Sequence, residues 1–347
     1  MNGSPHEPPE IRTCTDTPPG PRSVRPASTR RGVFLFIVGL LLLIAALWAV
    51  SGQRDAMHAA IAAARSAPWP LVVAVLMLPL ANYLVISLMF WALTRRYAPV
   101  RLTEMFALIG SSWLLNYLPM RPGMVGRIAY HKAVHGIRVR DSARILLWSL
   151  GATVFAAIIV LGIVLAIAGA GPVRLMGVAV ALAVPTGIYL RWRTAPDPWI
   201  AVSLRLADMC VWTVRYVAAF ALIGHRLDPL SAVVIAAASQ AAMVVPIQLG
   251  VREWIVGVVS AGLPGVLASI HGVGLAGENG APATGVLSGM GGGGVAAGAA
   301  LAPGLMAEIA NRCAELVWAI PIGTVSVVRL IRTKRALPAG IQPPERR

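Results

Sequence analysis

Several charged residues of this 347-residue chain lie inside otherwise apolar stretches, and their spacing suits the binding of an anion. Arg205 and Asp208 are three positions apart, so they can pair on one face of a helix, and Arg215 lies further along that face. Arg312 and Glu315 repeat the spacing in the last apolar stretch. The positive charges outnumber the negative ones, which would suit a ligand that carries phosphate. The alternative is that these residues are salt bridges between helices, above all for Asp208 and Glu315.

Two further segments interrupt apolar runs in the same way, each with a proline and a glycine four residues apart and an arginine soon after. Their residues of interest are Asn116, Pro119, Gly123 and Arg127 in the first segment, and Pro246, Gln248, Gly250, Arg252 and Glu253 in the second. A helix that begins past a break presents free N–H groups to an anion, so we expect Arg127 and Arg252 to contact the ligand. Asn116 and Gln248 would hydrogen-bond the ligand or free backbone groups. The alternative is that both breaks are only structural hinges.

The elements that must position these residues are membrane helices. Hydrophobic residues make up 57% of the chain and charged residues 13%, and the mean hydropathy is +0.73, values unlike those of soluble domains. Six apolar runs approach or exceed the roughly 20 residues that a helix needs to cross a bilayer. These runs are residues 33–50, 69–93, 143–171, 175–190, 200–224 and 303–331.

Two shorter apolar runs of 16 residues each, 105–120 and 230–245, lead into the two broken segments. A helix of that length covers roughly 24 Å, against about 30 Å for the bilayer core. We therefore predict an all-α polytopic membrane protein with about six transmembrane helices and two re-entrant half-helix hairpins. The order of span, half-span, break and span occurs twice, which predicts an inverted repeat with a site where the broken segments meet.

The basic residues predict how the chain lies in the membrane. Most of the 30 lysines and arginines fall in segments that are cytoplasmic if residues 1–32 are cytoplasmic and the spans alternate. We therefore expect a multi-pass protein with both termini in the cytoplasm. Arginine outnumbers lysine 28 to 2, which is consistent with a GC-rich bacterial genome, so we expect the membrane to be a bacterial plasma (inner) membrane. The net charge of +16 then reflects topology and contact with anionic phospholipid headgroups, not a nucleic-acid partner.

The chain divides into a membrane domain and polar ends. Residues 1–32 are polar and rich in proline, which predicts a disordered cytoplasmic tail, and residues 333–347 form a second tail. The transmembrane domain covers residues 33–332. Within it, residues 264–302 are rich in glycine and predict a flexible insert on the exterior side.

Patterns for catalysis and metal binding are weak. His131 and His135 have the spacing of two metal ligands on one helical face, but Lys132 lies between them and no carboxylate does. A basic helix at the membrane surface is the preferred interpretation. The sequence has no Ser-His-Asp or Cys-His grouping, no metal cluster and no phosphate-binding loop. We expect no cofactor, no metal and no enzymatic activity.

The two broken segments also resemble those of a known family. The first signature consists of Asn116, Pro119, Gly123 and Arg127, and the second of Pro246 followed by Gly250-Val251-Arg252-Glu253. This pair resembles the lysylphosphatidylglycerol synthase transmembrane region, also called the flippase-like family. The resemblance covers about residues 35–332 and implies a polytopic domain that moves aminoacylated or otherwise modified phospholipids between leaflets. The chain departs from the second signature at Gln248 and Leu249, where an extra glycine is common.

The function expected from these features is that of a lipid translocase for an anionic or modified phospholipid or a lipid-linked molecule. Arg205, Asp208, Arg215, Arg312 and Glu315 would form a polar track for the headgroup. Only 15 residues follow Arg332, too few for the soluble synthase domain of two-domain family members, so no synthase activity is expected.

Two alternatives remain open. A membrane-embedded transferase on lipid-linked substrates would need Glu104, Asp141 or Glu253 as its acid or base. A non-transporting partner of cell-envelope enzymes would use the two tails for binding.

Overall fold

In the computed structural model, the described residues are 54–117, 122–169, 171–192, 196–242, 251–270 and 294–335, together with Ile37 and Leu41. The long described segments form ten α-helices and no strand, which confirms the predicted all-α class. The helices are α2 (Arg54–Ser66), α3 (Trp69–Thr94), α4 (Leu102–Leu115), α5 (Pro122–His135), α6 (Val139–Ala168), α7 (Gly171–Trp192), α8 (Pro196–Leu222), α9 (Pro229–Ala242), α10 (Val251–Ile270) and α12 (Gly294–Arg335).

Four of these helices are long and apolar enough to cross a membrane. Their apolar parts are Trp69–Thr94 in α3, Val139–Ala168 in α6, Gly171–Leu190 in α7 and Leu301–Thr333 in α12. They correspond to four of the six predicted runs. The run 200–224 corresponds to α8, which is helical to Leu222. Its three charged residues make it too polar to count among the four candidate membrane spans. The run 33–50 lies almost wholly outside the described residues.

Two other apolar helices are shorter, as the sequence predicts. Both α4 and α9 have 14 residues, which corresponds to roughly 21 Å of helix. They occupy the predicted runs 105–120 and 230–245, and each ends near its predicted break. The end of α4 is Leu115, with Asn116 as the C-cap, and the end of α9 is Ala242. Four residues of the two motifs lie outside the described residues, namely Pro119, Pro246, Gln248 and Gly250.

A new helix begins after each break. The first residue of α5 is Pro122, and proline suits this position because the N–H that it lacks would have no partner there. The first residue of α10 is Val251, so Arg252 and Glu253 lie in the first turn, as predicted.

Residues at both ends of the predicted glycine-rich insert, 264–302, are helical. α10 continues to Ile270 and α12 begins at Gly294, so both ends of the predicted insert belong to helices. Alanine has the highest helix propensity of all residues, and the alanines after Gly294 explain why α12 begins before the run predicted from hydropathy. Residues 271–293 lie outside the described residues.

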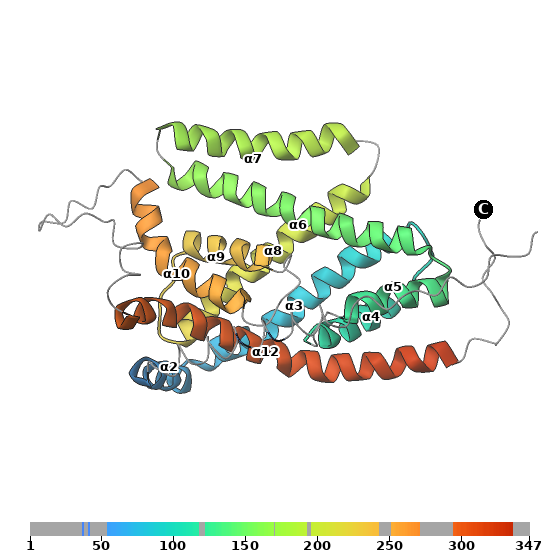
Figure 1. The fold of residues 1–347 in the computed structure, drawn as a ribbon, viewed down its shortest axis with the longest axis horizontal. Coiled ribbons are helices and arrows are strands. Elements are labelled where there is room, and N and C mark those ends of the chain that lie inside the picture. Colours follow the sequence, from blue (N-terminus) through green and yellow to red (C-terminus); the bar gives the residue numbers. More distant parts are fainter. Residues whose placement is uncertain are drawn as a thin grey trace, which may run out of the picture.

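The helices form a bundle in which α3 and α8 pack along each other through the centre (Figure 1). α12 runs along one side, where it contacts α4, α8 and α10, and α7 lies at the opposite side against α6. The helices on either side of each break are in contact, α4 with α5 and α9 with α10. Segments far apart in the sequence therefore meet around α8.

Glycines allow two helix pairs to approach closely. A Cβ atom on Gly162 of α6 would lie 2.8 Å from the backbone nitrogen of Ala181 in α7. A Cβ atom on Gly323 of α12 would collide with Leu114 of α4. Small residues at such contacts are typical of membrane helix pairs. The close approach of α4 and α12 matters for the site because its charged residues come partly from α12.

The outer face of α6 is apolar, unlike the outer face of a helix in a soluble protein. Exposed residues follow one another at helical spacing, and they are Leu147, Leu150, Val154, Ile158 and Leu161. The opposite face is buried and includes Ala152, Ala156 and Ile159. Exposed apolar residues also cover α7, among them Leu175 and Leu182. This arrangement is the one expected for helices that face lipid.

Candidate functional site

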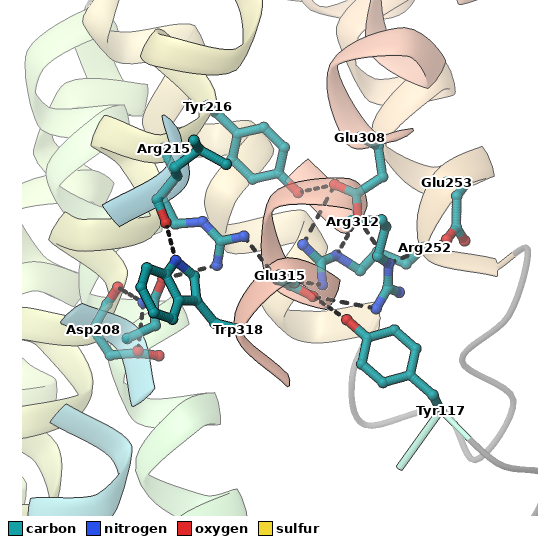
Figure 2. Close-up of polar contacts among 12 residues, drawn as sticks. Tyr117, Asp208, Arg215, Tyr216, Arg252, Glu253, Glu308, Arg312, Glu315 and Trp318 are labelled. Atoms are coloured by element: carbon teal, nitrogen blue, oxygen red, sulfur yellow. Dashed lines mark hydrogen bonds and ion pairs between the residues drawn. The ribbon is translucent and has the colours of Figure 1, made fainter. Parts of the chain in front are cut away.

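Charged side chains from α8, α10 and α12 meet in the interior of the bundle (Figure 2). The α12 residues Glu308, Arg312 and Glu315 are spaced so that all three lie on one face of that helix. An isolated charge in an apolar interior costs several kcal/mol, so each of these groups needs a partner or a function.

The first part of the network lies on α8 and is the pair that the sequence predicts. Arg205 Nη1 donates to Asp208 Oδ2 at 2.9 Å, and Asp208 is fully buried. Two residues outside the predicted set complete this group. Asn82 of α3 donates to Asp208 Oδ1 at 2.7 Å, and Gln240 Oε1 of α9 accepts a hydrogen bond from Arg205 Nη2 at 2.8 Å. Three helices are thereby joined at one ion pair.

Arg215, which the sequence leaves without a partner, is bound by residues from two other helices. Its Nη1 donates to Asn82 Oδ1 at 2.8 Å and its Nη2 donates to Glu315 Oε1, also at 2.8 Å. Its guanidinium group lies over the ring of Trp212, 3.8 Å from the ring centroid. Asn82 therefore bridges Asp208 and Arg215.

Glu308 is the largest omission of the sequence-based prediction. It is fully buried, it accepts a hydrogen bond from Tyr216 at 2.7 Å, and its Oε1 lies 2.8 Å from Arg252 Nε and 3.3 Å from Arg312 Nε. A signal existed in the sequence, because Glu308 lies four residues before Arg312 and so on the same helical face. Glu308, together with Glu315, compensates the charges of the buried Arg252 and the partly buried Arg312.

The predicted pair Arg312–Glu315 is confirmed, with 3.6 Å between Nη1 and Oε2. Arg312 Nε also lies 3.2 Å from Glu253 Oε1, which ties α12 to the first turn of α10. Glu315 Oε2 accepts a hydrogen bond from Tyr117 at 2.9 Å. Tyr117 comes just after α4, so this bond links the first broken segment to the network (Figure 2).

A cavity of about 260 Å³ opens beside this network. Its wall includes four arginines and two carboxylates, namely Arg127, Arg205, Arg215, Arg312, Asp208 and Glu315. Amide groups of Asn82, Asn116 and Gln240 also contribute, as do aromatic rings from Tyr83, Phe90, Trp113, Tyr117 and Trp212. The cavity thus gathers most of the predicted site residues from both halves of the chain.

Arg252 and Glu253 are not part of the described cavity wall. Arg252 is 2% exposed, is bound to Glu308 and lies over the Trp212 ring at 4.2 Å from its centroid. In this conformation Arg252 is a partner for buried carboxylates. Gln248 lies outside the described residues.

Arg127 differs from the other arginines of the cavity. It is 7% exposed and lies over the ring of Phe90, 4.0 Å from the centroid, but its Nε and Nη1 have no hydrogen-bond partner among the described residues. No carboxylate of the described part of the chain forms an ion pair with it, whereas Arg205, Arg215 and Arg312 each have one. Arg127 therefore gives the cavity wall an uncompensated positive charge.

The position of Arg127 depends on how closely α5 approaches α4. Ser112 Oγ of α4 donates to the carbonyl of Gly123 at 3.0 Å. A Cβ atom on Gly123 would lie 2.5 Å from the Ser112 carbonyl oxygen and 2.8 Å from Asn116 Oδ1. Only glycine fits here, so the predicted break residue Gly123 is also a packing residue.

His131 and His135 do not share a ligand position; the polar contact is between His135 and Glu104. His135 Nε2 lies 2.8 Å from Glu104 Oε1, and Tyr130 donates to the same oxygen at 2.7 Å. The His131 and His135 rings are 6.3 Å apart. The described residues contain no group of three or more histidine, cysteine, aspartate or glutamate side chains that could hold a metal. Glu104 thus joins the start of α4 to the end of α5.

The possible acids or bases of a transferase have partners in different parts of the molecule. Glu104 is bound to Tyr130 and His135, and Glu253 to Arg312. Asp141 lies 3.5 Å from Arg144 on an exposed part of α6. Neither Glu104, Asp141 nor Glu253 lines the described cavity.

Comparison of the chain with protein-family models, with curated proteins and with solved structures finds no match in any of the three. The resemblance stated from the two motifs therefore stays a prediction, and the geometry of the cavity carries the functional argument.

Proposed function

We propose that this protein is a lipid translocase of the flippase-like type, in which a lipid headgroup crosses the membrane through the cavity beside the buried network. The observation that carries the proposal is the buried Arg127, which has no ion-pair partner among the described residues and lies on the wall of a cavity inside a bundle with apolar outer helices. Buried charge within a membrane is rare and is typical of substrate pathways.

The proposed arrangement in the membrane is the one predicted from the sequence. It has about six spans, cytoplasmic termini in a bacterial plasma membrane, and re-entrant hairpins formed by α4–α5 and α9–α10. The 14-residue lengths of α4 and α9 support the hairpins, because neither helix is long enough to cross alone. The repeated order α3, α4, α5, α6 and α8, α9, α10, α12 supports an inverted repeat.

The proposed roles follow from the contacts. Arg127 binds the phosphate, and Arg205, Arg215 and Arg312 line the path with their carboxylate partners. Arg252 holds Glu308 and Glu315 in place from outside the cavity wall. Tyr83 and Trp113 stack with their ring centroids 5.5 Å apart and form an apolar part of the wall.

The test is a leaflet-resolved assay with the purified chain in vesicles that contain tail-labelled phosphatidylglycerol. We expect labelled lipid to exchange between leaflets faster than in protein-free vesicles, and Arg127→Gln to lower the rate by about tenfold, the effect of roughly 1.4 kcal/mol. Lys132→Gln removes the same charge from an exposed position on α5 and is the matched control. Equal rates with and without protein would contradict the proposal.

A further inference from the structure

We propose that the ligand of this cavity is a phosphate ester whose headgroup carries no ammonium group, so that an aminoacylated phospholipid is disfavoured. That the ligand is a lipid rests on the proposed function. The chemistry of its headgroup follows from the cavity wall alone. It narrows the range of headgroups that the family resemblance allows.

Several polar groups on the wall lack a partner among the described residues. Most of the buried wall atoms without a hydrogen bond among the described residues are N–H donors. They include Nε and Nη1 of Arg127, Nε of Arg205, Nε of Arg215 and Nε2 of Gln240. Because Gln240 Oε1 already accepts from Arg205, its Nε2 is the end that remains free. A ligand that satisfies this wall must supply several acceptors, as a phosphate group does.

The carboxylates of the wall are the groups that would bind an ammonium ion. Asp208 accepts from Asn82 at one oxygen and from Arg205 at the other. Glu315 accepts from Arg215 at one oxygen and from Tyr117 at the other. Both carboxylates of the described wall are therefore occupied on both sides. An ammonium group in the cavity would have to share these oxygens with the donors already bound to them.

The balance of charge on the described wall also favours an anionic ligand. Arg127 is the arginine of the described wall that has no ion pair, so one negative charge on the ligand would compensate it. A guanidinium group is a common partner of phosphate in proteins, and Nε and Nη1 of Arg127 are two N–H groups without a hydrogen-bond partner among the described residues. A lysyl or alanyl ester would place a cation beside it, which like-charge repulsion opposes.

The size of the cavity limits the rest of the headgroup. Its volume of about 260 Å³ is near the lower end of small-molecule sites. It has room for a phosphate and a small polar group. The acceptor without a partner, Asn116 Oδ1, would suit a hydroxyl of such a group. A glycerophospholipid such as phosphatidylglycerol and a polyprenyl phosphate share the required chemistry.

The test is native mass spectrometry of the purified full chain with one lipid at a time. The lipids are phosphatidylglycerol, lysyl-phosphatidylglycerol with the same tails, and undecaprenyl phosphate. We expect at least one of the two lipids without an ammonium group to be retained about tenfold more than the lysyl ester. The better of those two identifies the source of the phosphate. Equal or stronger retention of the lysyl ester would overturn the inference, and this comparison on the wild-type chain needs no variant.

Variants and a probe without acyl chains separate this inference from the proposed function. Arg127→Gln should reduce retention of the preferred lipid to the level of the lysyl ester, whereas Lys132→Gln should leave it unchanged. Unchanged retention in a folded Arg127→Gln variant would contradict the phosphate site. Glycerol 3-phosphate bound as strongly as the lipid would support the phosphate site and contradict a lipid function. Selective retention without leaflet exchange would leave the inference standing and refute the translocase.

Discussion

Among single residues, Glu308 connects buried groups from three helices. It contacts Arg252 and Arg312 and accepts a hydrogen bond from Tyr216, so it joins α8, α10 and α12 at one carboxylate. Glu315 has the corresponding role about two turns further along α12, where it contacts Arg215 and Tyr117. The two glutamates compensate the arginines that would otherwise be unpaired in an apolar interior.

The first prediction follows from this role of Glu308. Glu308→Gln removes the negative charge from two buried arginines, and breaking a buried ion pair on one side costs about 3–5 kcal/mol. We expect a clear fall in the melting temperature of the detergent-solubilised protein. Cys313→Ala on the exposed side of α12 is the control and should leave the melting temperature nearly unchanged. A Glu308→Gln variant as stable as the parent would contradict the structural role.

At the scale of elements, the cavity depends on how α5 lies against α4. The contact is made at Gly123, where there is no room for a Cβ atom, and it fixes the helix that carries Arg127. The other end of the pair is held by Glu104, which contacts Tyr130 and His135. These two contacts decide where the unpaired guanidinium enters the cavity.

The second prediction tests the contact at Gly123. Gly123→Ala places a methyl group against the backbone of Ser112, and overpacking of this kind costs about 1–3 kcal/mol. We expect α5 to move, so that both phosphatidylglycerol retention and leaflet exchange fall. Gly126→Ala, one turn along the same helix, meets no atom within 4 Å and is the matched control. Equal activity of the two variants would show that the close contact is not needed.

The third prediction concerns pH and the Glu104 contact. Partial burial acts to raise the pKa of Glu104, but hydrogen bonds from His135 and Tyr130 outweigh it and hold the pKa below its usual range. A carboxyl group with a lowered pKa stabilises the folded state above its unfolded pKa, and this contribution is lost as the pH falls through the folded pKa.

Melting temperatures measured from about pH 7 to about pH 3 test this contribution. The range extends below the ordinary glutamate pKa of about 4.3, so it covers the pH at which the contribution is lost. We expect the difference in melting temperature between the parent and Glu104→Gln to be largest at neutral pH and to shrink on acidification. A difference that grows as the pH falls would have the wrong sign and would contradict this account.

For the whole molecule, the arrangement around α8 brings the two halves of the chain together at one cavity. Tyr117 of the first half contacts Glu315 of the second, and Asn82 contacts Arg215. If the halves form an inverted repeat, α4 starts from the cytoplasm and α9 from the exterior.

The fourth prediction tests this topology with single cysteines in a background where Cys14, Cys210 and Cys313 are replaced by serine. Arg226→Cys lies in the exposed connection before α9, and Arg101→Cys lies just before α4. A membrane-impermeant maleimide should label Arg226→Cys in intact cells and Arg101→Cys only after the membrane is opened. Labelling of both from the same side would contradict the inverted repeat.

Patterns along the sequence were sufficient for the apolar helices of the described part and for local pairs. Apolar length predicted α4 and α9 as short helices, and three-residue spacing predicted the Arg205–Asp208 and Arg312–Glu315 pairs. Both inferences work because the geometry of a helix fixes which neighbours along the chain share a face.

Only the tertiary structure decided which distant groups meet. No pattern along the chain indicates that Arg215 binds Glu315, a hundred positions away, or that Asn82 and Gln240 complete the Asp208 pair. Sequence patterns also left Arg127 and Arg252 equivalent. Packing gives Arg252 a carboxylate, whereas Arg127 on the cavity wall has none among the described residues. The physical reason is that partners across helices depend on the rotation and depth at which the helices pack, which spacing within one helix does not specify.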